Sequence, residues 1–346
     1  MTGPASDGAV LRGPRVWLRA FVGFYPPRER TASELDPVAK FLFSARSVIL
    51  VISAQAALIA GLLAAADGRF DAASFVLVLV GFVTAHAISN LSNDYFGHRR
   101  GHDTPDSPRI RYTIHPIASG VLDTKSLLVG LAVLAAIGTA IVADFWVVRG
   151  LPALGFSLAG LALLYLYDAA PRPLKSLGLG EVAAFVVWGP LMVGGGYYVI
   201  TGRPALTAFL AGVPYGLGVM SILIGKHIDQ AEFDRNHGQR TLPVFLGERR
   251  ARALTRAIIV AMYAVVAALV AAGRLTPFVA LVAIALPKAG RALAVIGDPK
   301  PLAPPPGYVG WPLWYHRVAL VHNRLFGWLY IAGLAIGAIA AGIRPG

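Results

Sequence analysis

The sequence has 346 residues, of which 56% are hydrophobic and only 14% charged, and its formal net charge is +13. A soluble domain carries roughly a quarter of its residues as charged side chains. This composition therefore excludes a soluble globular protein and indicates a polytopic membrane protein. The sequence contains no cysteine, which excludes a disulfide framework and thiolate chemistry.

Residues 1–44 are polar, basic and rich in proline. They lack an apolar core followed by a small-residue cleavage site, so we expect no signal peptide. Within them, PRVWLRAFVGF (14–24) alternates arginine with tryptophan and phenylalanine. That pattern fits a short helix lying at the membrane interface, although a frayed basic tail fits it equally well. We expect residues 45–346 to form one membrane domain.

Nine later stretches are long and apolar enough to span a bilayer, which requires about 20 residues each. Because these runs are too long for strands and do not alternate, the sequence predicts an all-α fold. The eighth stretch is the weakest, since Pro287, Lys288 and Arg291 interrupt it. The expected spans are 46–66, 72–92, 127–148, 150–167, 181–200, 205–225, 253–273, 276–296 and 319–342.

The positive charge is concentrated in every second connection. The N-terminal segment and the loops after the second, fourth, sixth and eighth spans hold most of the lysine and arginine, whereas the opposite loops hold about one cation each. The positive-inside rule then places the N-terminus in the cytoplasm and the C-terminus outside, in the cytoplasmic (inner) membrane. This charge is explained by topology and by lipid headgroups, so we expect no nucleic-acid partner.

A first polar cluster, SNLSNDYFGHRRGHDTPD, follows the second span. His86, Asn90, Asn93 or Asp94, and Gly97 recur at steps of three or four, which is one face of a helix. Such a stripe in a membrane helix usually lines a cavity. Asp103 and Asp106 follow in the loop.

A second cluster, GKHIDQAEFDRNHGQRTLPVFLG, follows the sixth span. Lys226 and Asp229 are three residues apart and could pair on a helix face. The cluster also contains Glu232, Asp234 and Arg240. Taken alone, either cluster could be a solvated loop held by salt bridges.

Both clusters lie on the same expected side, at the mouth of an apolar bundle. Oxygen ligands of this kind suit Mg²⁺, which one or two carboxylates commonly hold together with substrate phosphates. Zinc is disfavoured, because there is no cysteine and no histidine pair at ligand spacing. The residues thus suggest Mg²⁺-assisted loss of diphosphate from an isoprenoid whose tail lies in the bundle.

Three segments carry a resemblance to a known family. NLSNDYFGHRRGHDTPD, YDAAPRPLKSLGLGE and DRNHGQRTLPVFLGE resemble, in this order, three motif regions of the UbiA superfamily of intramembrane prenyltransferases. The resemblance implies nine helices and two aspartate-rich motifs on the cytoplasmic side. It is closest to the branch that prenylates 1,4-dihydroxy-2-naphthoate in menaquinone synthesis.

The resemblance also implies roles for particular residues. Asn93, Asp94, Asp103, Asp229 and Asp234 would hold Mg²⁺, and Asp94, Asp103, Asp234 and Lys175 would be catalytic. The substrates would contact Asn90, Arg172, Lys226, Arg240 and Tyr167. The implied substrates are a polyprenyl diphosphate and an aromatic acceptor, and membrane lipids surround the protein.

The sequence departs from the family pattern at three positions. Gly97 and Gln230 stand where aspartate is usual, and Lys226 stands where asparagine is usual. Lys226 either supplies part of a metal's charge to the diphosphate or pairs with Asp229. Elsewhere, His86 either hydrogen-bonds the acceptor or is a satisfied structural histidine.

Three other interpretations remain open from sequence. The acceptor could be 4-hydroxybenzoate, homogentisate, haem, or a lipid or sugar phosphate. The protein could be a relative that binds lipid without catalysis, or a membrane transporter, although the predicted helices carry no acid at mid-span. The sequence does not indicate the oligomeric state.

Overall fold

The computed structural model describes residues 12–22, 34–308 and 310–343, and the described residues confirm an all-α protein with nine membrane-length helical segments. Some segments consist of two or three consecutive helices. The spans are α4 (Ser47–Ala66), α5 (Ala72–Arg99), α7 (Thr124–Arg149), α8 with η2 (Leu151–Leu164, Tyr165–Ala169), α9 with η4 and α10 (Gly180–Val186, Val187–Leu191, Met192–Thr201), α11 (Leu206–Asn236), α13 (Glu248–Ala271), η5 with α14 (Pro277–Ala285, Leu286–Gly297) and α15 (Tyr315–Ile343).

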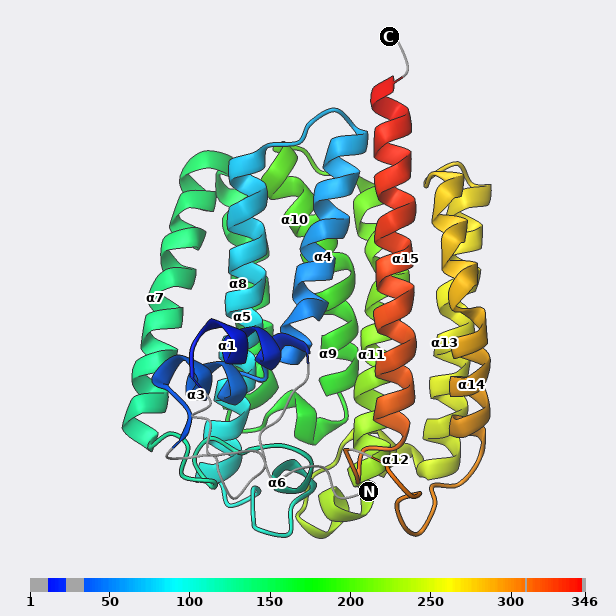
Figure 1. Ribbon diagram of the computed structural model, residues 1–346. Helices are drawn as coiled ribbons and strands as arrows, with labels where there is room; N and C mark the ends of the chain where they lie inside the picture. The colour runs from blue at the N-terminus through cyan, green and yellow to red at the C-terminus, as the bar shows by residue number, and fades with distance from the viewer. Residues whose placement is uncertain (1–11, 23–33, 309, 344–346) are drawn as a thin grey trace.

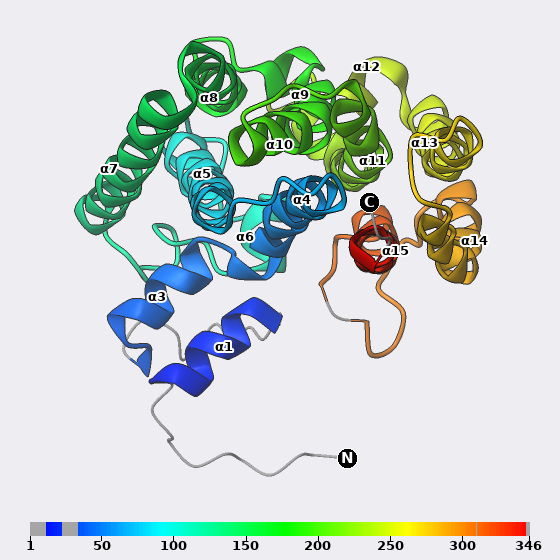
Figure 2. The ribbon, with the colours of Figure 1, turned by 90° about the horizontal axis from the view of Figure 1, so that it is seen from above.

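The spans follow one another around an arc in chain order, and α15 returns to lie beside α4 (Figure 2). Glycine permits a close approach of two helices in this bundle. A Cβ on Gly212 of α11 would lie 2.5 Å from the carbonyl oxygen of Gly189 in η4. The two backbones therefore pack without side chains between them, which is typical of helix contacts in membranes.

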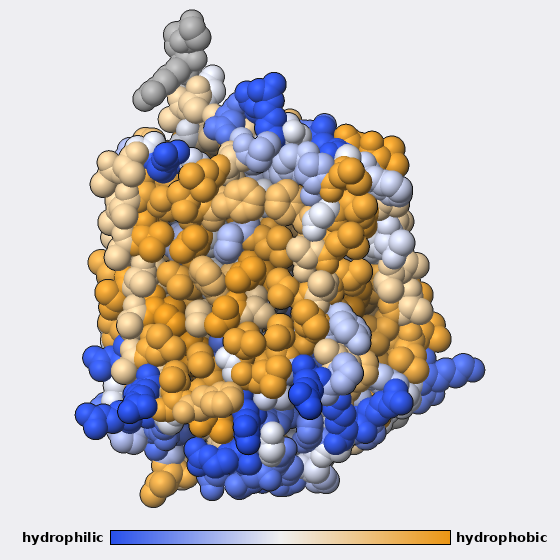
Figure 3. Space-filling model, turned by 180° about the vertical axis from the view of Figure 1, so that it is seen from behind, coloured by the Kyte–Doolittle hydropathy of each residue, from blue (hydrophilic) through white to orange (hydrophobic). Residues whose placement is uncertain are grey.

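The surface divides into an apolar band and polar rims (Figure 3). Hydrophilic residues gather most densely at the lower rim, where Figure 1 places the short helices α6 (Pro108–Tyr112) and α12 (Leu242–Leu246). The apolar band is the surface expected to contact lipid, because charged groups and unpaired backbone groups find no hydrogen-bond partners in hydrocarbon.

Within the described ranges, two helices precede the first span. In α1 (Pro14–Val22), Leu18 and Phe21 are exposed, while Val16 and Ala20 pack against α3 (Pro37–Ser44). The Asp36 carboxylate caps α3 by accepting the Ala39 N–H at 2.7 Å, and it also accepts the Trp17 indole N–H at 3.0 Å. The expected helix in 14–24 is thus present through Val22, and residues 23 and 24 lie outside the described residues.

Helices α5 and α11 continue well beyond their expected ends. The sequence predicts spans ending at 92 and 225, but the helices run to Arg99 and Asn236. Once a helix has left the apolar band, polar residues with adequate helix propensity can extend it without a bilayer constraint. Most of each polar cluster therefore lies on a helix, and both helix ends reach the same rim.

Asp229 caps the N-terminus of α15. Its carboxylate accepts the backbone N–H groups of Trp314, Tyr315 and His316 at 2.8, 3.2 and 3.0 Å, and the Lys300 ammonium lies 3.5 Å away. The first N–H groups of a helix have no partner within it, so a carboxylate there is strongly favoured. Asp229 thus pairs with Lys300, and the expected pairing with Lys226 is not formed.

We predict that Asp229→Ala destabilises the protein by about 2 kcal/mol or more, because it leaves several N–H groups without their acceptor and the Lys300 ammonium without its counter-ion. The melting temperature in detergent should fall by several degrees. Glu232→Ala, an exposed acid on the same helix, is the control and should leave the melting temperature unchanged. An Asp229→Ala protein with an unaltered melting temperature would contradict the capping role.

Candidate functional site

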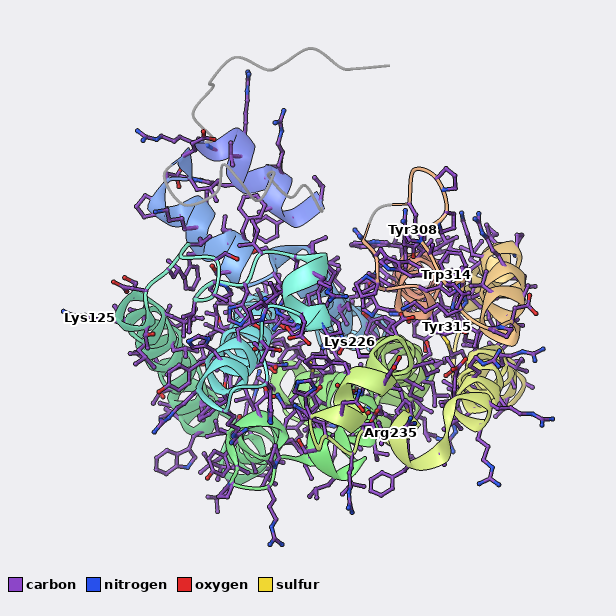
Figure 4. The ribbon with its side chains drawn as sticks, turned by 90° about the horizontal axis from the view of Figure 1, so that it is seen from below. Lys125, Lys226, Arg235, Tyr308, Trp314 and Tyr315 are labelled. Atoms are coloured by element: carbon purple, nitrogen blue, oxygen red, sulfur yellow. The ribbon has the colours of Figure 1, made fainter. Side chains whose placement is uncertain are left out.

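Two connected hollows occupy the interior. An apolar cavity of about 1070 Å³ lies among α4, α5, α7, α8, α10 and α15, and a polar pocket of about 60 Å³ lies at the lower rim. Asn93, Tyr167 and Lys226 line both. Figure 4, seen from below, shows Lys226 near the middle of the bundle, whereas Lys125 points outward from its edge.

The polar pocket brings together the two clusters expected from sequence. Its walls combine two carboxylates with three permanent cations, two histidines and several neutral oxygen-bearing side chains. The carboxylates are Asp103 and Asp234, the cations Arg109, Lys175 and Lys226, the histidines His102 and His227, and the neutral residues include Asn93, Ser107, Gln230, Gln239 and Thr241.

Asp94 does not line this pocket but forms a buried ion pair with Arg109, which does. Its Oδ1 accepts from Arg109 Nε at 2.8 Å, its Oδ2 accepts from Arg109 Nη2 at 2.5 Å, and Arg46 lies 3.5 Å away. Burial opposes the charge on Arg109, but the Asp94 carboxylate holds the pKa of that guanidinium above its ordinary value. Asp94, expected at the metal, is therefore engaged by arginine in this structure, and it positions Arg109.

Asp103 takes the space that a side chain at position 97 would fill. A Cβ on Gly97 would lie only 2.2 Å from Asp103 Oδ2. The same oxygen lies 3.1 Å from Nε2 of His115, whose Nδ1 accepts the Ala118 N–H at 3.1 Å. Because Nδ1 is an acceptor, the proton of neutral His115 lies on Nε2 and is donated to Asp103. A carboxylate thus occupies the position of the side chain that Gly97 lacks.

Lys175 approaches the pocket from η3 (Leu174–Leu177). Its ammonium lies 2.8 Å from the buried carboxylate of Asp168 and donates to Asn93 Oδ1 at 3.0 Å. Arg100 fixes the preceding turn, since its guanidinium donates to the carbonyl groups of Asp168, Ala169 and Ala170. The end of η2 is therefore tied to the end of α5.

Lys226 and Asp234 lie on one face of α11. Lys226 is half-buried and, within the described residues, makes no hydrogen bond or salt bridge, in contrast to Lys175 and Arg109. Asp234 is buried and accepts the Thr241 hydroxyl at 3.1 Å. An ammonium that has no salt-bridge partner and borders an apolar cavity is suited to bind an anion.

Two histidine contacts complete the pocket. His227 Nδ1 lies 2.6 Å from the buried Glu181 carboxylate, which also accepts the Leu242 N–H. His102 Nδ1 lies 2.9 Å from Gln239 Nε2. Burial, and then the charge of Lys175, lowers the pKa of His102, so its ring is neutral at pH 7 and accepts from the amide.

The remaining expected residues lie elsewhere. Asn90 lines the apolar cavity and donates to the Ala45 carbonyl at 2.9 Å. Arg172 and Arg240 are exposed and line neither hollow. Asp229 caps α15 on another face of α11, so the structure does not bring it to the pocket.

Sequence reasoning missed several residues of the site. From sequence, Arg109 is one of the topological charges of the loop after the second span, and the sequence predicts no role in the site for Asp168, Gln239 or the Glu181–His227 pair. A signal existed for Asp168, since YD directly precedes the Pro- and Lys-containing segment in the second quoted motif. No local signal marks Arg109, because its partner lies 15 residues away.

This arrangement defines a class: an intramembrane protein with a cationic pocket that opens onto a large apolar cavity. The chain matches the UbiA prenyltransferase family over residues 54–303 and belongs to it. It is therefore a transferase of the prenyltransferase type.

Similar proteins include the 1,4-dihydroxy-2-naphthoate octaprenyltransferase of Bacillus subtilis, 25% identical over 76% of this chain and 84% of the relative. Among solved structures, a digeranylgeranylglyceryl phosphate synthase aligns with a TM-score of 0.56 at 18% identity, over 87% of this chain and 98% of that one. A UbiA homolog from Archaeoglobus fulgidus bound to GPP and Mg²⁺ aligns with a TM-score of 0.51 at 16% identity, over 86% and 99%. The structural likenesses show the fold.

We predict that Gly97→Ala lowers the rate of prenyl transfer at least tenfold, because the new Cβ displaces the Asp103 carboxylate from His115. The initial rate in detergent or liposomes measures this. Gly290→Ala is the matched control, since a Cβ at this glycine of α14 meets no atom within 4 Å. Unchanged activity in Gly97→Ala would show that the position of Asp103 does not matter.

Proposed function

We propose that the protein transfers a polyprenyl group, in a Mg²⁺-dependent reaction, from an isoprenyl diphosphate to an aromatic acceptor, 1,4-dihydroxy-2-naphthoate. The observation that carries this proposal is the junction of the two hollows. An amphiphilic diphosphate has one strongly anionic end and one apolar tail. The polar pocket and the apolar cavity have matching properties, and they meet at Asn93, Tyr167 and Lys226.

The pocket's charges favour the diphosphate. Of its three permanent cations, Arg109 is neutralised by Asp94 and Lys175 by Asp168, which leaves Lys226 without a salt-bridge partner in the described structure. Lys226 of α11 would donate to the phosphate oxygens, and Lys175 of η3 would bind them as well. Such contacts between charged groups are about twice as strong as neutral hydrogen bonds.

The donor set fits Mg²⁺. The pocket offers the Asp103 and Asp234 carboxylates with the Asn93 amide, and Mg²⁺ is commonly held by one or two carboxylates together with waters and substrate phosphates. When bound, the ion would neutralise charge on the departing diphosphate. Among the described residues no group of three or more His, Cys, Asp or Glu side chains could hold a metal, so the substrate would complete its coordination. The Archaeoglobus homolog bound to GPP and Mg²⁺ supports this proposal.

The reaction would take place at the junction. The allylic C–O bond breaks and its electron pair goes to the diphosphate, while the ring carbon that carries the carboxylate forms the new C–C bond. That carbon then loses CO₂, and the electron pair of the broken C–C bond returns to the ring and restores its aromaticity. The chain would contribute the ring of Tyr167 beside the developing cation and apolar walls that exclude water.

The acceptor is supported by two observations. The curated relatives include 1,4-dihydroxy-2-naphthoate octaprenyltransferases of three bacteria. In addition, Arg46, Arg317 and Arg324 line the apolar cavity, and ionisable groups within a membrane usually serve a polar substrate. An acceptor with a carboxylate would place its charge among these guanidinium groups. By the positive-inside rule, the rim with α6 and α12 would face the cytoplasm.

We predict Mg²⁺-dependent product when the purified protein is incubated with a polyprenyl diphosphate and 1,4-dihydroxy-2-naphthoate, and none with EDTA. Mass spectrometry would identify the product, and 4-hydroxybenzoate and homogentisate would be tested in parallel. Product with one of these acceptors would keep the reaction and change the acceptor. No product with any acceptor would contradict the proposal.

We also predict that Lys226→Met lowers kcat/KM for the diphosphate by about 10- to 100-fold, the effect of losing one charge-assisted hydrogen bond. Lys226→Arg should retain more activity, since it keeps the charge. Lys125→Met, a neutral substitution at the exposed rim of the bundle (Figure 4), is the control. Equal activity in Lys226→Met and Lys125→Met would remove Lys226 from the site.

A further inference from the structure

We propose that His86 is the specificity-determining donor for the acceptor: its Nε2–H binds a ring oxygen of the aromatic substrate inside the apolar cavity. This inference rests on the proposed function. It begins from a feature of the cavity that neither the diphosphate nor the metal explains, a chain of hydrogen bonds through Trp188, Ser53 and His86.

The chain links three spans. Trp188 Nε1 of η4 lies 2.9 Å from Ser53 Oγ of α4, and Ser53 Oγ lies 2.9 Å from His86 Nδ1 of α5. The rings of Trp188 and His86 meet edge to face, with their centroids 5.0 Å apart and planes at 70°. His86 is therefore held by a hydrogen bond on one side and by a ring contact on another.

The direction of these bonds determines the tautomer. An indole nitrogen can only donate, so Ser53 Oγ must accept from Trp188. Ser53 is fully buried and, within the described residues, its hydroxyl has no hydrogen-bond partner other than Trp188 and His86, so its hydrogen is satisfied only when it is donated to His86 Nδ1. A neutral histidine whose Nδ1 accepts carries its proton on Nε2, and His86 consequently offers an N–H as its remaining polar group.

The Nε2–H group of His86 borders a cavity that is large enough for a ligand. His86 lines the large cavity. Within the described residues its Nε2 forms no hydrogen bond, and this atom is not completely enclosed by protein. A prenyl tail against this position would leave the donor unsatisfied, which carries a desolvation penalty. A hydroxyl or carbonyl oxygen would satisfy it.

The position along α5 also suits the acceptor. His86 precedes Asn90 by one helical turn and Asn93 by two, so it lies about 10 Å along the helix from the junction. A naphthalene ring system with its substituents spans much of that length. His86 could therefore hold the end of the acceptor remote from the diphosphate, while the reacting carbon lies at the junction.

A second buried histidine provides a contrast. His322 of α15 is fully buried, and its Nε2 lies 2.8 Å from the Tyr263 hydroxyl. It does not line the cavity. His322 thus has a structural hydrogen bond at the atom that His86 presents to the cavity, which makes it the matched control.

The test compares two ligands on the full-length protein in detergent, by calorimetric titration. One ligand is 1,4-dihydroxy-2-naphthoate and the other is 2-naphthoate, which lacks both ring oxygens. We expect His86→Phe to weaken binding of the dihydroxy compound about tenfold, the effect of one lost hydrogen bond, and to leave 2-naphthoate binding unchanged. His86→Gln, which keeps an N–H donor, should restore most of the affinity.

The outcomes separate this inference from the proposed function. If His322→Phe changes the two affinities as His86→Phe does, or if His86→Phe weakens both ligands equally, the effect is structural and the inference fails. If the wild type binds neither naphthoate, the inference fails with its acceptor. If the wild type binds the dihydroxy compound with His86-dependent affinity but makes no product, the inference stands and the proposed reaction fails.

Discussion

The buried ion pair of Asp94 and Arg109 organises the polar end of this protein. Both side chains are nearly inaccessible, and the guanidinium binds the carboxylate through two nitrogens. Removing one partner of such a pair costs about 3–5 kcal/mol, because the other charge is left buried. The pair ties α6 to the end of α5, and the intervening loop therefore carries Asp103 and Ser107 into the pocket. Lys175 of η3 and Asp234 of α11 complete the lining of the pocket.

The packing and charges of the pocket give physical reasons for the three departures from the family motifs. Gly97 makes room for Asp103 Oδ2, so a carboxylate is supplied from the loop instead of from the helix. Lys226 and Gln230 place a positive charge and a neutral amide on the face of α11 that also carries Asp234. The pocket consequently has few carboxylates and a permanent cation. We interpret Lys226 as supplying to the diphosphate part of the positive charge that a more acidic pocket would obtain from metal ions.

Much of the fold was predictable because hydropathy alone marks a segment that must cross a bilayer. All nine expected spans are present, and the two polar clusters meet as their common side required. The ends of α5 and α11 were not predictable from hydropathy, since polar residues beyond the apolar band neither require nor forbid a helix. The contacts of Asp229 were also not predictable from sequence. One residue of shift rotates a side chain by about 100° around a helix, and only the position of α15 reveals that Asp229 faces that helix.

We propose above all that the pocket between the ends of α5 and α11 binds the diphosphate while the cavity holds the prenyl tail. An experimental structure with Mg²⁺ and a prenyl thiolodiphosphate, whose sulfur resists cleavage, tests this most directly. We predict diphosphate density in contact with Lys175 and Lys226, a metal beside Asp103 and Asp234, and a tail that extends past Tyr167 into the cavity. Diphosphate bound at the rim near Arg172 or Arg240, with the pocket empty, would contradict it.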